Sequence, residues 1–240
     1  MQRARTAQDK DLRRNHLLQA AAHLFADTDF DGVTIAHIAQ RAGVAKGTAY
    51  LYFSCKEAVF LELLQTELLE WEAALGGALG SSFVGAEQAA AQGPCAAALA
   101  SSTSHAIART LAQRPTLCRL LVLLHTVIEP RLDFASAQAF KLFLRDLVAR
   151  LSGHITRHLG GLSAGQGASL VLQIHALVIS ITQLASPPPV IASVLESDAS
   201  LQSMRIAFEP FFAATLQSLL LGTLLQHAAA LIGNTVAIPE

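Results

Sequence analysis

The stretch Thr34–Phe53 constrains the fold of this chain more than any other feature, because its order is typical of two short helices that meet at an angle. Ile35 and Ile38 recur at the spacing of one helical face, and Thr34 precedes them as a residue type that caps helices. Gly43 follows, and glycine readily takes the left-handed conformation that ends a helix and turns the chain. The pattern therefore predicts a helix-turn-helix.

The second helix of this motif carries small, cationic and phenolic side chains, which suit the groove of a DNA duplex. Lysines neutralise phosphates, and hydroxyl groups donate hydrogen bonds to phosphate oxygens. Gly47 permits close backbone approach, and Thr48 is placed to reach a base edge or a thymine methyl group. The expected DNA contacts are Thr34, Lys46, Gly47, Thr48, Tyr50, Tyr52 and Lys56.

The order T-I-x-x-I-A-x-x-A-G-V-x-K-G-T-x-Y-x-Y-F, followed by Ser54, Cys55, Lys56 and Glu57, resembles the N-terminal domain of TetR-family transcriptional regulators of the TetR/AcrR type. The resemblance extends from about Arg13 to about Leu63. It implies an all-α protein with a three-helix DNA-binding domain at residues 1–55 and a larger ligand-binding and dimerisation domain at residues 56–240. It also implies a homodimer on double-stranded operator DNA.

Two positions depart from the usual pattern of this family. Ala45 stands where Ser or Thr usually caps the recognition helix, and an alanine cap costs a helix about 1 kcal/mol. Ala49 occupies a position that a larger aliphatic residue usually fills. Neither departure removes an expected phosphate contact, so the prediction of DNA binding is unchanged.

The composition is unusually apolar for a soluble monomer, with 52% hydrophobic and 15% charged residues and a mean hydropathy of +0.42. A membrane-associated helical protein is one interpretation. However, polar residues interrupt the longest apolar stretch, 170–185, before it reaches the roughly 18 residues of a membrane helix. The N-terminus also lacks the apolar core of a signal peptide. We therefore expect a cytoplasmic protein that buries apolar surface in an oligomer interface and a ligand cavity.

The charge distribution adds modest support for DNA binding, although the net charge is only −1. Residues 1–57 hold eight Lys and Arg against six Asp and Glu, whereas residues 58–240 hold nine against twelve. We expect a basic face and a basic N-terminal arm, and for the arm merely solvated charge is the alternative. The basic residues concerned are Arg3, Arg5, Lys10, Arg13, Arg14, Lys46 and Lys56.

The spacing of apolar residues and helix-breaking residues predicts about nine or ten helices and no strands. The first is expected at 10–25, and Ser54 and Glu57 are expected to form a capping box for a fourth helix that Gly76 and Gly77 end. Further helices are expected at 95–113, 115–128, 136–159, 164–184 and 201–221, with a possible short one in the linker 186–200 and another at 223–232. Pro210 is expected to kink the 201–221 helix or to separate its first turn.

The last two long helices are apolar nearly all round, which indicates burial either by a partner or within a large subunit. A four-helix bundle between two subunits is the favoured interpretation, and burial within one subunit is the alternative. The expected interface residues are Leu170, Ile174, Leu177, Val178, Ile181, Phe208, Phe211, Phe212, Leu216 and Leu219.

Polar residues embedded in apolar helical runs are candidates for orienting a small hydrophobic effector. They are His105, Arg109, His125, Thr126, Gln173 and His175, and a hydrogen-bonded core or interface role is the alternative for each. The three cysteines share no metal-ligand spacing, and inert thiols are the favoured interpretation. A redox role for Cys55, which lies just inside a helix start, is the alternative. Neither a metal nor a cofactor is expected.

An enzymatic function is not expected, because residues 58–240 contain no cluster of the kind that a recombinase needs. Glu129 and Asp133 are the nearest acidic pair there, and they flank a proline. The sequence thus predicts a ligand-responsive transcriptional regulator. A repressor that binds a palindromic operator as a dimer, and that a small apolar effector releases, is favoured over a non-inducible or activating regulator.

Overall fold

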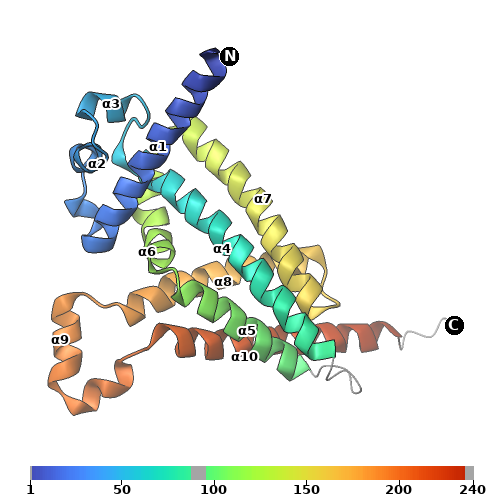
Figure 1. The fold of residues 1–240 in the computed structure, drawn as a ribbon. Coiled ribbons are helices and arrows are strands. Elements are labelled where there is room, and N and C mark those ends of the chain that lie inside the picture. Colours follow the sequence, from blue (N-terminus) through green and yellow to red (C-terminus); the bar gives the residue numbers. More distant parts are fainter. Residues whose placement is uncertain (1, 88–95, 236–240) are drawn as a thin grey trace.

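A computed structural model of the chain, which describes residues 2–87 and 96–235, contains ten α-helices and no strands in that part of the chain (Figure 1). The all-α prediction is confirmed. A small head holds α1 (Gln2–Asp27), the 3₁₀ turn η1 (Phe30–Gly32), α2 (Ile35–Arg41) and α3 (Lys46–Tyr50). The helices α4 to α10 form the larger body, and α4 also belongs to the head.

The helix-turn-helix forms as the sequence predicts. The Thr34 hydroxyl oxygen accepts a hydrogen bond from the His37 backbone N–H at 3.2 Å, which caps α2. Gly43 has a φ of 70°, so it takes the left-handed conformation that turns the chain toward α3. Ile38 and Ala49, from the two helices, are each at most 1% exposed and lie in the core of the head.

The helix α4 (Lys56–Glu87) runs from the head along the whole body, so the expectation that Gly76 and Gly77 end it is wrong. Gly76 instead allows α7 to approach, because a Cβ atom there would lie 3.1 Å from the His154 ring. Packing against α5 and α7 outweighs the low helix propensity of glycine. The structure shows no hydrogen bond between Ser54 and Glu57, the pair expected to form a capping box, among the described residues.

The body consists of α5 (Ala96–Ala112), α6 (Pro115–Leu123), the π-helical turn η2 (Leu124–Ile128), the 3₁₀ turn η3 (Glu129–Arg131), α7 (Phe134–Leu159) and α8 (Ala164–Ala185). Pro115 occupies the first turn of α6, where its missing N–H has no helical partner to lose. The Asp133 carboxylate caps α7, and Ser163 and Gln166 form a capping box at the start of α8.

The chain ends in α9 (Pro189–Ser197), the 3₁₀ turn η4 (Ala199–Met204) and α10 (Phe208–Thr235). The expected helix at 201–221 is therefore wrong at its start, and the expected separate helix at 223–232 is a continuation of α10. Pro210 is the third residue of α10 and neither kinks nor splits it, because the first turn needs no N–H at that position.

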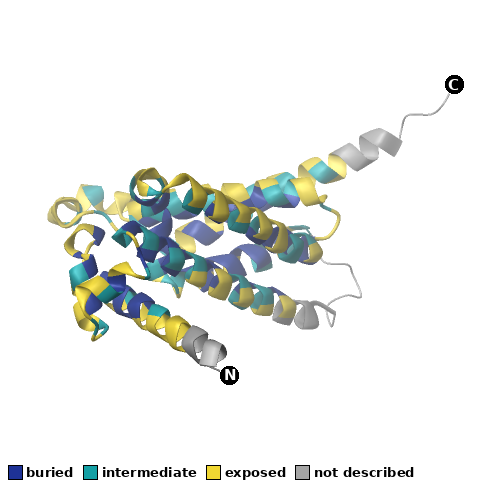
Figure 2. Ribbon diagram, turned by 90° about the horizontal axis from the view of Figure 1, so that it is seen from above, coloured by how far each residue is buried: buried dark blue, intermediate teal, exposed yellow. Residues whose placement is uncertain are grey.

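Buried residues form one connected core from the head to the far end of the body, with exposed residues on the outer faces of the helices (Figure 2). Within the described residues, α8 and the segment Phe208–Ala229 of α10 are long and apolar enough to cross a membrane by length and composition. A core helix of a soluble protein passes the same test.

Candidate functional site

The second helix of the motif, α3, presents a small exposed surface at one end of the molecule (Figure 1). Lys46, Gly47 and Tyr50 are exposed, and the Lys46 ammonium lies 6.0 Å from the centre of the Tyr50 ring. Thr34 is also exposed, whereas Thr48 and Tyr52 are half-buried. The structure thus brings five of the seven expected DNA contacts together on α3 and in the two residues that follow it.

Lys56, another expected phosphate contact, has a different environment. Its ammonium donates hydrogen bonds to the carbonyl oxygens of Phe30, at 2.9 Å, and Val33, at 3.2 Å. It also lies 4.1 Å from the centre of the Phe30 ring. These contacts fix the η1 turn against the start of α4, and a phosphate contact by Lys56 stays a prediction.

Arg14 belongs to the expected basic face, but its side chain points into a structural network. Its guanidinium donates two hydrogen bonds to the Glu62 carboxylate and one, at 3.3 Å, to the Tyr52 carbonyl oxygen. The hydrogen bonds that Arg14 donates to the Glu62 carboxylate raise the pKa of Arg14 above its ordinary value. Arg14 therefore joins α1, α4 and the end of the recognition helix, while Lys10 and Arg13 remain exposed.

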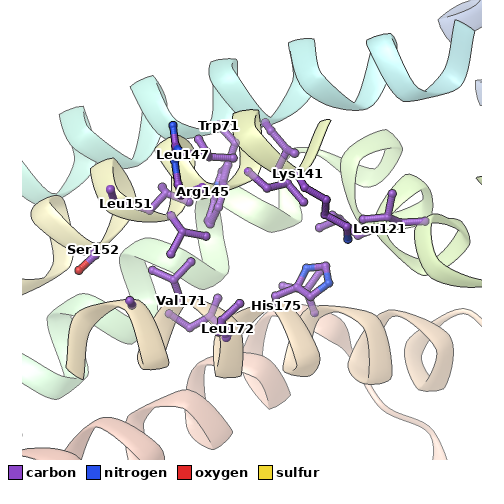
Figure 3. A pocket seen from close by; sticks show the side chains of 18 of the residues that line it. Trp71, Leu121, Lys141, Arg145, Leu147, Leu151, Ser152, Val171, Leu172 and His175 are labelled. Atoms are coloured by element: carbon purple, nitrogen blue, oxygen red, sulfur yellow. The ribbon is translucent and has the colours of Figure 1, made fainter. Parts of the chain in front are cut away.

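A cavity of about 670 Å³ lies in the body between α4, α6, α7 and α8 (Figure 3). Its walls are mainly apolar, which suits a small apolar ligand. Trp71, the single tryptophan of the chain, lines the cavity from α4, and its indole N–H donates to the Thr110 hydroxyl at 3.2 Å. The apolar lining also includes Leu68, Leu121, Leu144, Leu147, Val148, Leu151, Val171, Ile174 and Val178.

Two of the six expected ligand contacts lie in this cavity. His125 comes from the π-helical turn and His175 from α8, and their Nε2 atoms lie 2.9 Å apart. Burial lowers the pKa of His175 below its ordinary value, and the neighbouring His125 lowers it further. The Nδ1 atom of His125 lies 3.1 Å from the Glu129 carboxylate, which also accepts a hydrogen bond from Lys141 at 2.7 Å.

The other four expected ligand contacts lie outside the cavity. His105 and Arg109 are exposed on α5. Thr126 lines a crevice between the head and the turns η2 and η3, and Gln173 lines a crevice between α8 and α10. Sequence reasoning missed Trp71, Lys141 and Arg145, which all line the cavity. Two cations one helical turn apart on α7 were the available pattern for Lys141 and Arg145.

The expected interface residues divide into two groups. Six of them are at most 2% exposed within one subunit, namely Leu170, Ile174, Val178, Ile181, Phe212 and Leu216. For these six the structure shows the alternative, burial inside the subunit, because α8 and α10 direct them toward the other body helices. Phe211 is 43% exposed, and Leu177, Phe208 and Leu219 are half-buried.

One contact connects the body directly to the end of α1. Arg119 of α6 donates hydrogen bonds to the carbonyl oxygens of Phe25, at 2.7 Å, and Thr28, at 3.0 Å. Its guanidinium also lies 4.1 Å from the centre of the Phe25 ring. Because α6 continues into the turn that carries His125, a single segment contacts both the cavity and the head.

Two family models match the chain and meet inside α4. The model described as bacterial regulatory proteins of the tetR family matches residues 17–63, and the model described as the C-terminal domain of tetracyclin repressor-like proteins matches residues 65–227. The second match alone covers more than half of the chain.

Similar individual proteins fall into two groups. The transcriptional repressor KstR2 and the transcriptional activator FasR, both of Mycolicibacterium smegmatis, are each 41% identical, over 59 and 56 residues respectively. These matches cover 25% and 23% of this chain and only 28% and 26% of the relatives. A possible TetR-family regulator from Streptomyces coelicolor A3(2) has the same fold, with a TM-score of 0.56, 19% identity, and coverage of 89% of this chain and 98% of that one.

Proposed function

Because the chain belongs to the TetR family and is a transcriptional regulator rather than an enzyme, we propose that it is a cytoplasmic, ligand-responsive repressor. In this proposal a homodimer binds a palindromic operator, and a small, largely apolar effector releases it. The observation that carries the ligand response is the cavity of about 670 Å³ beside α4 and α6, both of which contact the head.

The exposed surface of α3 would enter the major groove. Lys46 would neutralise a phosphate, while the hydroxyl groups of Tyr50, Tyr52 and Thr34 would donate to phosphate oxygens. Thr48 is the residue placed to reach a base edge. The short recognition helix reads few base pairs, so useful specificity requires two copies at a fixed spacing.

The second copy would pack on the outer faces of α8 and α10. On α10 the exposed positions Ala214, Ser218 and Gly222 recur every fourth residue and form a stripe of small side chains. The exposed apolar side chains of Phe211 and Leu225 lie at the two ends of this stripe. A partner helix can approach such a face closely, and the flanking side chains supply apolar area.

Effector binding would act on the head through α4 and α6. Trp71 of α4 and Leu121 of α6 line the cavity, and Arg119 holds α6 to the end of α1. If the effector displaces either helix, the head moves with it, and the spacing of the two recognition helices no longer matches the operator.

The test is a footprint across the upstream region of the chain's own gene, followed by fluorescence anisotropy with the protected DNA and a panel of apolar compounds. Compounds that raise the melting temperature of the free protein should weaken operator binding, by the reciprocity of linked equilibria. If every stabilising compound leaves operator affinity unchanged, the protein is a non-inducible regulator. If no upstream DNA binds at any salt concentration, the operator assignment fails. Reporter expression in the presence and absence of the gene separates a repressor from an activator.

A further inference from the structure

The cavity is elongated, and its two ends differ chemically. It follows α8 from Ala164 to Val178 and α7 from Lys141 to Ser152, which is about 17–21 Å at about 1.5 Å per residue. The two helices meet closely at one end, where the Ser152 hydroxyl donates to the Ala164 carbonyl oxygen at 3.3 Å. A cavity that extends along two helices in this way fits a linear molecule.

Positive and imidazole groups lie toward the opposite end, with Lys141 and His175 at that end and Arg145 one helical turn nearer the middle of the cavity. Lys141 and Arg145 lie one turn apart on α7, and Figure 3 shows both beside the cavity, with His175 on the α8 side. The side chains of Lys141 and Arg145 are 57% and 68% exposed, so they mark the mouth of the cavity. Among the described residues that line the cavity, none carries a carboxylate.

The two carboxylates nearest these cations, Glu129 and Asp146, do not line the cavity. Glu129 contacts Lys141 and His125, and Asp146 contacts Arg145 at 2.7 Å. Both pairs are partly exposed to solvent, so each contributes little to stability, and an anion at the mouth can share or replace the carboxylate. A cationic ligand would instead meet only positive and neutral lining groups.

We propose that the effector is a linear amphiphile with an anionic head group, a refinement that rests on the proposed function. Its apolar chain lies in the cavity, between α7 and α8, and extends toward Ser152 and Ala164. Its head group lies at the mouth, where Lys141 and Arg145 supply positive charge and His175 supplies a ring N–H or acceptor nitrogen. A free carboxylate and the phosphates of a coenzyme A thioester share this chemistry.

Trp71 provides the measurement, because the single tryptophan lines the cavity and its emission reports occupancy without DNA. Purified full-length protein is titrated with straight-chain fatty acids of increasing length, with the alcohols of the same lengths, and with the coenzyme A thioesters. Affinity for the acids should rise about fourfold per methylene until the cavity is filled. The acids or the thioesters should bind more tightly than the alcohols, and added salt should reduce that difference.

Charge-removing variants locate the head group. The double variant Lys141→Gln/Arg145→Gln should weaken binding of the anionic ligand roughly fivefold to tenfold and leave the alcohol unchanged. Arg157→Gln is the matched control, because Arg157 is an exposed arginine of the same helix that does not line the cavity. The ligand whose affinity falls in the double variant, acid or thioester, identifies the source of the anionic head.

Equal affinity for acids, thioesters and alcohols, or an unchanged double variant, would overturn the anionic-head proposal. Either result would leave the inducible-repressor proposal in place if an alcohol still released the protein from the operator. Absence of any binding by all three series would overturn the linear amphiphile. Operator binding by the free protein is measured separately, so a failure of the DNA-binding proposal is distinguishable from either outcome.

Discussion

Lys46 and Lys56 are ten positions apart at the helix-turn-helix, yet their side chains have different surroundings. Lys46 is exposed beside Tyr50, whereas Lys56 donates to two backbone carbonyl oxygens of the head. Lys46→Ala should weaken binding to all DNA sequences and reduce the slope of log affinity against log salt by about 0.9. Anisotropy at several salt concentrations measures both quantities.

Lys56→Ala should act mainly on the folded state. Hydrogen bonds from a charged group contribute about 1.5–3 kcal/mol, and partial exposure reduces this to about 1–2 kcal/mol. Urea unfolding should therefore show a lower free energy of unfolding for Lys56→Ala than for Lys46→Ala. Equal stability of the two variants, together with an altered salt slope for Lys56→Ala, would reassign Lys56 as a phosphate contact.

The two cysteines that the structure describes should differ in reactivity. Burial raises the pKa of the Cys118 thiol to about 11, whereas Cys55 is half-buried at the start of α4. At pH 8 only about one Cys118 in a thousand is a thiolate, and the thiolate is the nucleophile. Iodoacetamide should therefore modify Cys118 only after unfolding, which peptide mass spectrometry detects.

The raised pKa of Cys118 also predicts the direction of a pH effect on stability. The folded state favours the protonated thiol, so its contribution is fully present below the unfolded pKa of about 9 and is lost as the pH rises toward 11. Cys118→Ser should flatten the decline in the free energy of unfolding over this range. An unchanged decline, or rapid alkylation of folded Cys118, would show that the thiol is accessible.

The exposed positions of the helix-turn-helix could be predicted largely from sequence, because they lie within one local motif whose spacing sets their faces. Their contacts with DNA stay a prediction. The cavity could be predicted only in part. His125 and His175 stood out as polar residues in apolar runs, but their contact joins residues 50 positions apart. For α8 and α10, an apolar surface all round does not reveal which face the rest of the subunit covers. The pattern therefore includes six residues in the expected interface that the subunit itself buries.

Among whole helices, the sequence predicts their presence better than their ends. The Gly76–Gly77 pair and Pro210 were expected to interrupt helices, and neither does. At Gly76 the His154 ring of α7 packs into the space that a side chain would occupy. This tertiary packing compensates for the low helix propensity of glycine. At Pro210 only the position within the helix matters, and that position depends on where α10 begins.

The hairpin of α7 and α8 provides a test of close packing. A Cβ atom at Gly167 would lie 2.2 Å from the Ser152 hydroxyl oxygen and 2.5 Å from the Thr156 methyl carbon. Gly167→Ala should therefore destabilise the protein by about 1–3 kcal/mol, because the two helices must separate. Thermal unfolding measures the change.

Gly165 is the matched control on the same helix. It is exposed, and a Cβ atom there would meet nothing within 4 Å. Gly165→Ala should stabilise the protein by up to about 1 kcal/mol, since alanine loses less backbone entropy in a helix. If both variants had the same melting temperature, the α7–α8 contact at Gly167 would be looser than described.

At the scale of the whole molecule, the proposed dimer depends on the small-residue stripe of α10. Ser218→Arg places a long charged side chain in the middle of that stripe and should yield monomers that bind operator DNA weakly. Light scattering at micromolar concentration measures the molar mass. Ala139→Arg, on an exposed position of α7, is the control and should remain dimeric. A dimeric Ser218→Arg variant would place the interface elsewhere.

Because α4 is one continuous helix, a small rotation at its cavity end produces a larger displacement at its head end. From Trp71 at the cavity to Lys56 at the head, the helix spans about 22 Å at about 1.5 Å per residue. A rigid arm of that length converts a tilt of about 5° at one end into a shift of about 2 Å at the other. Hydrogen bonds tolerate only about 0.5 Å of stretch. In the proposed mechanism, a ligand would therefore need only a small displacement of its own surroundings to detach a recognition helix from its phosphates.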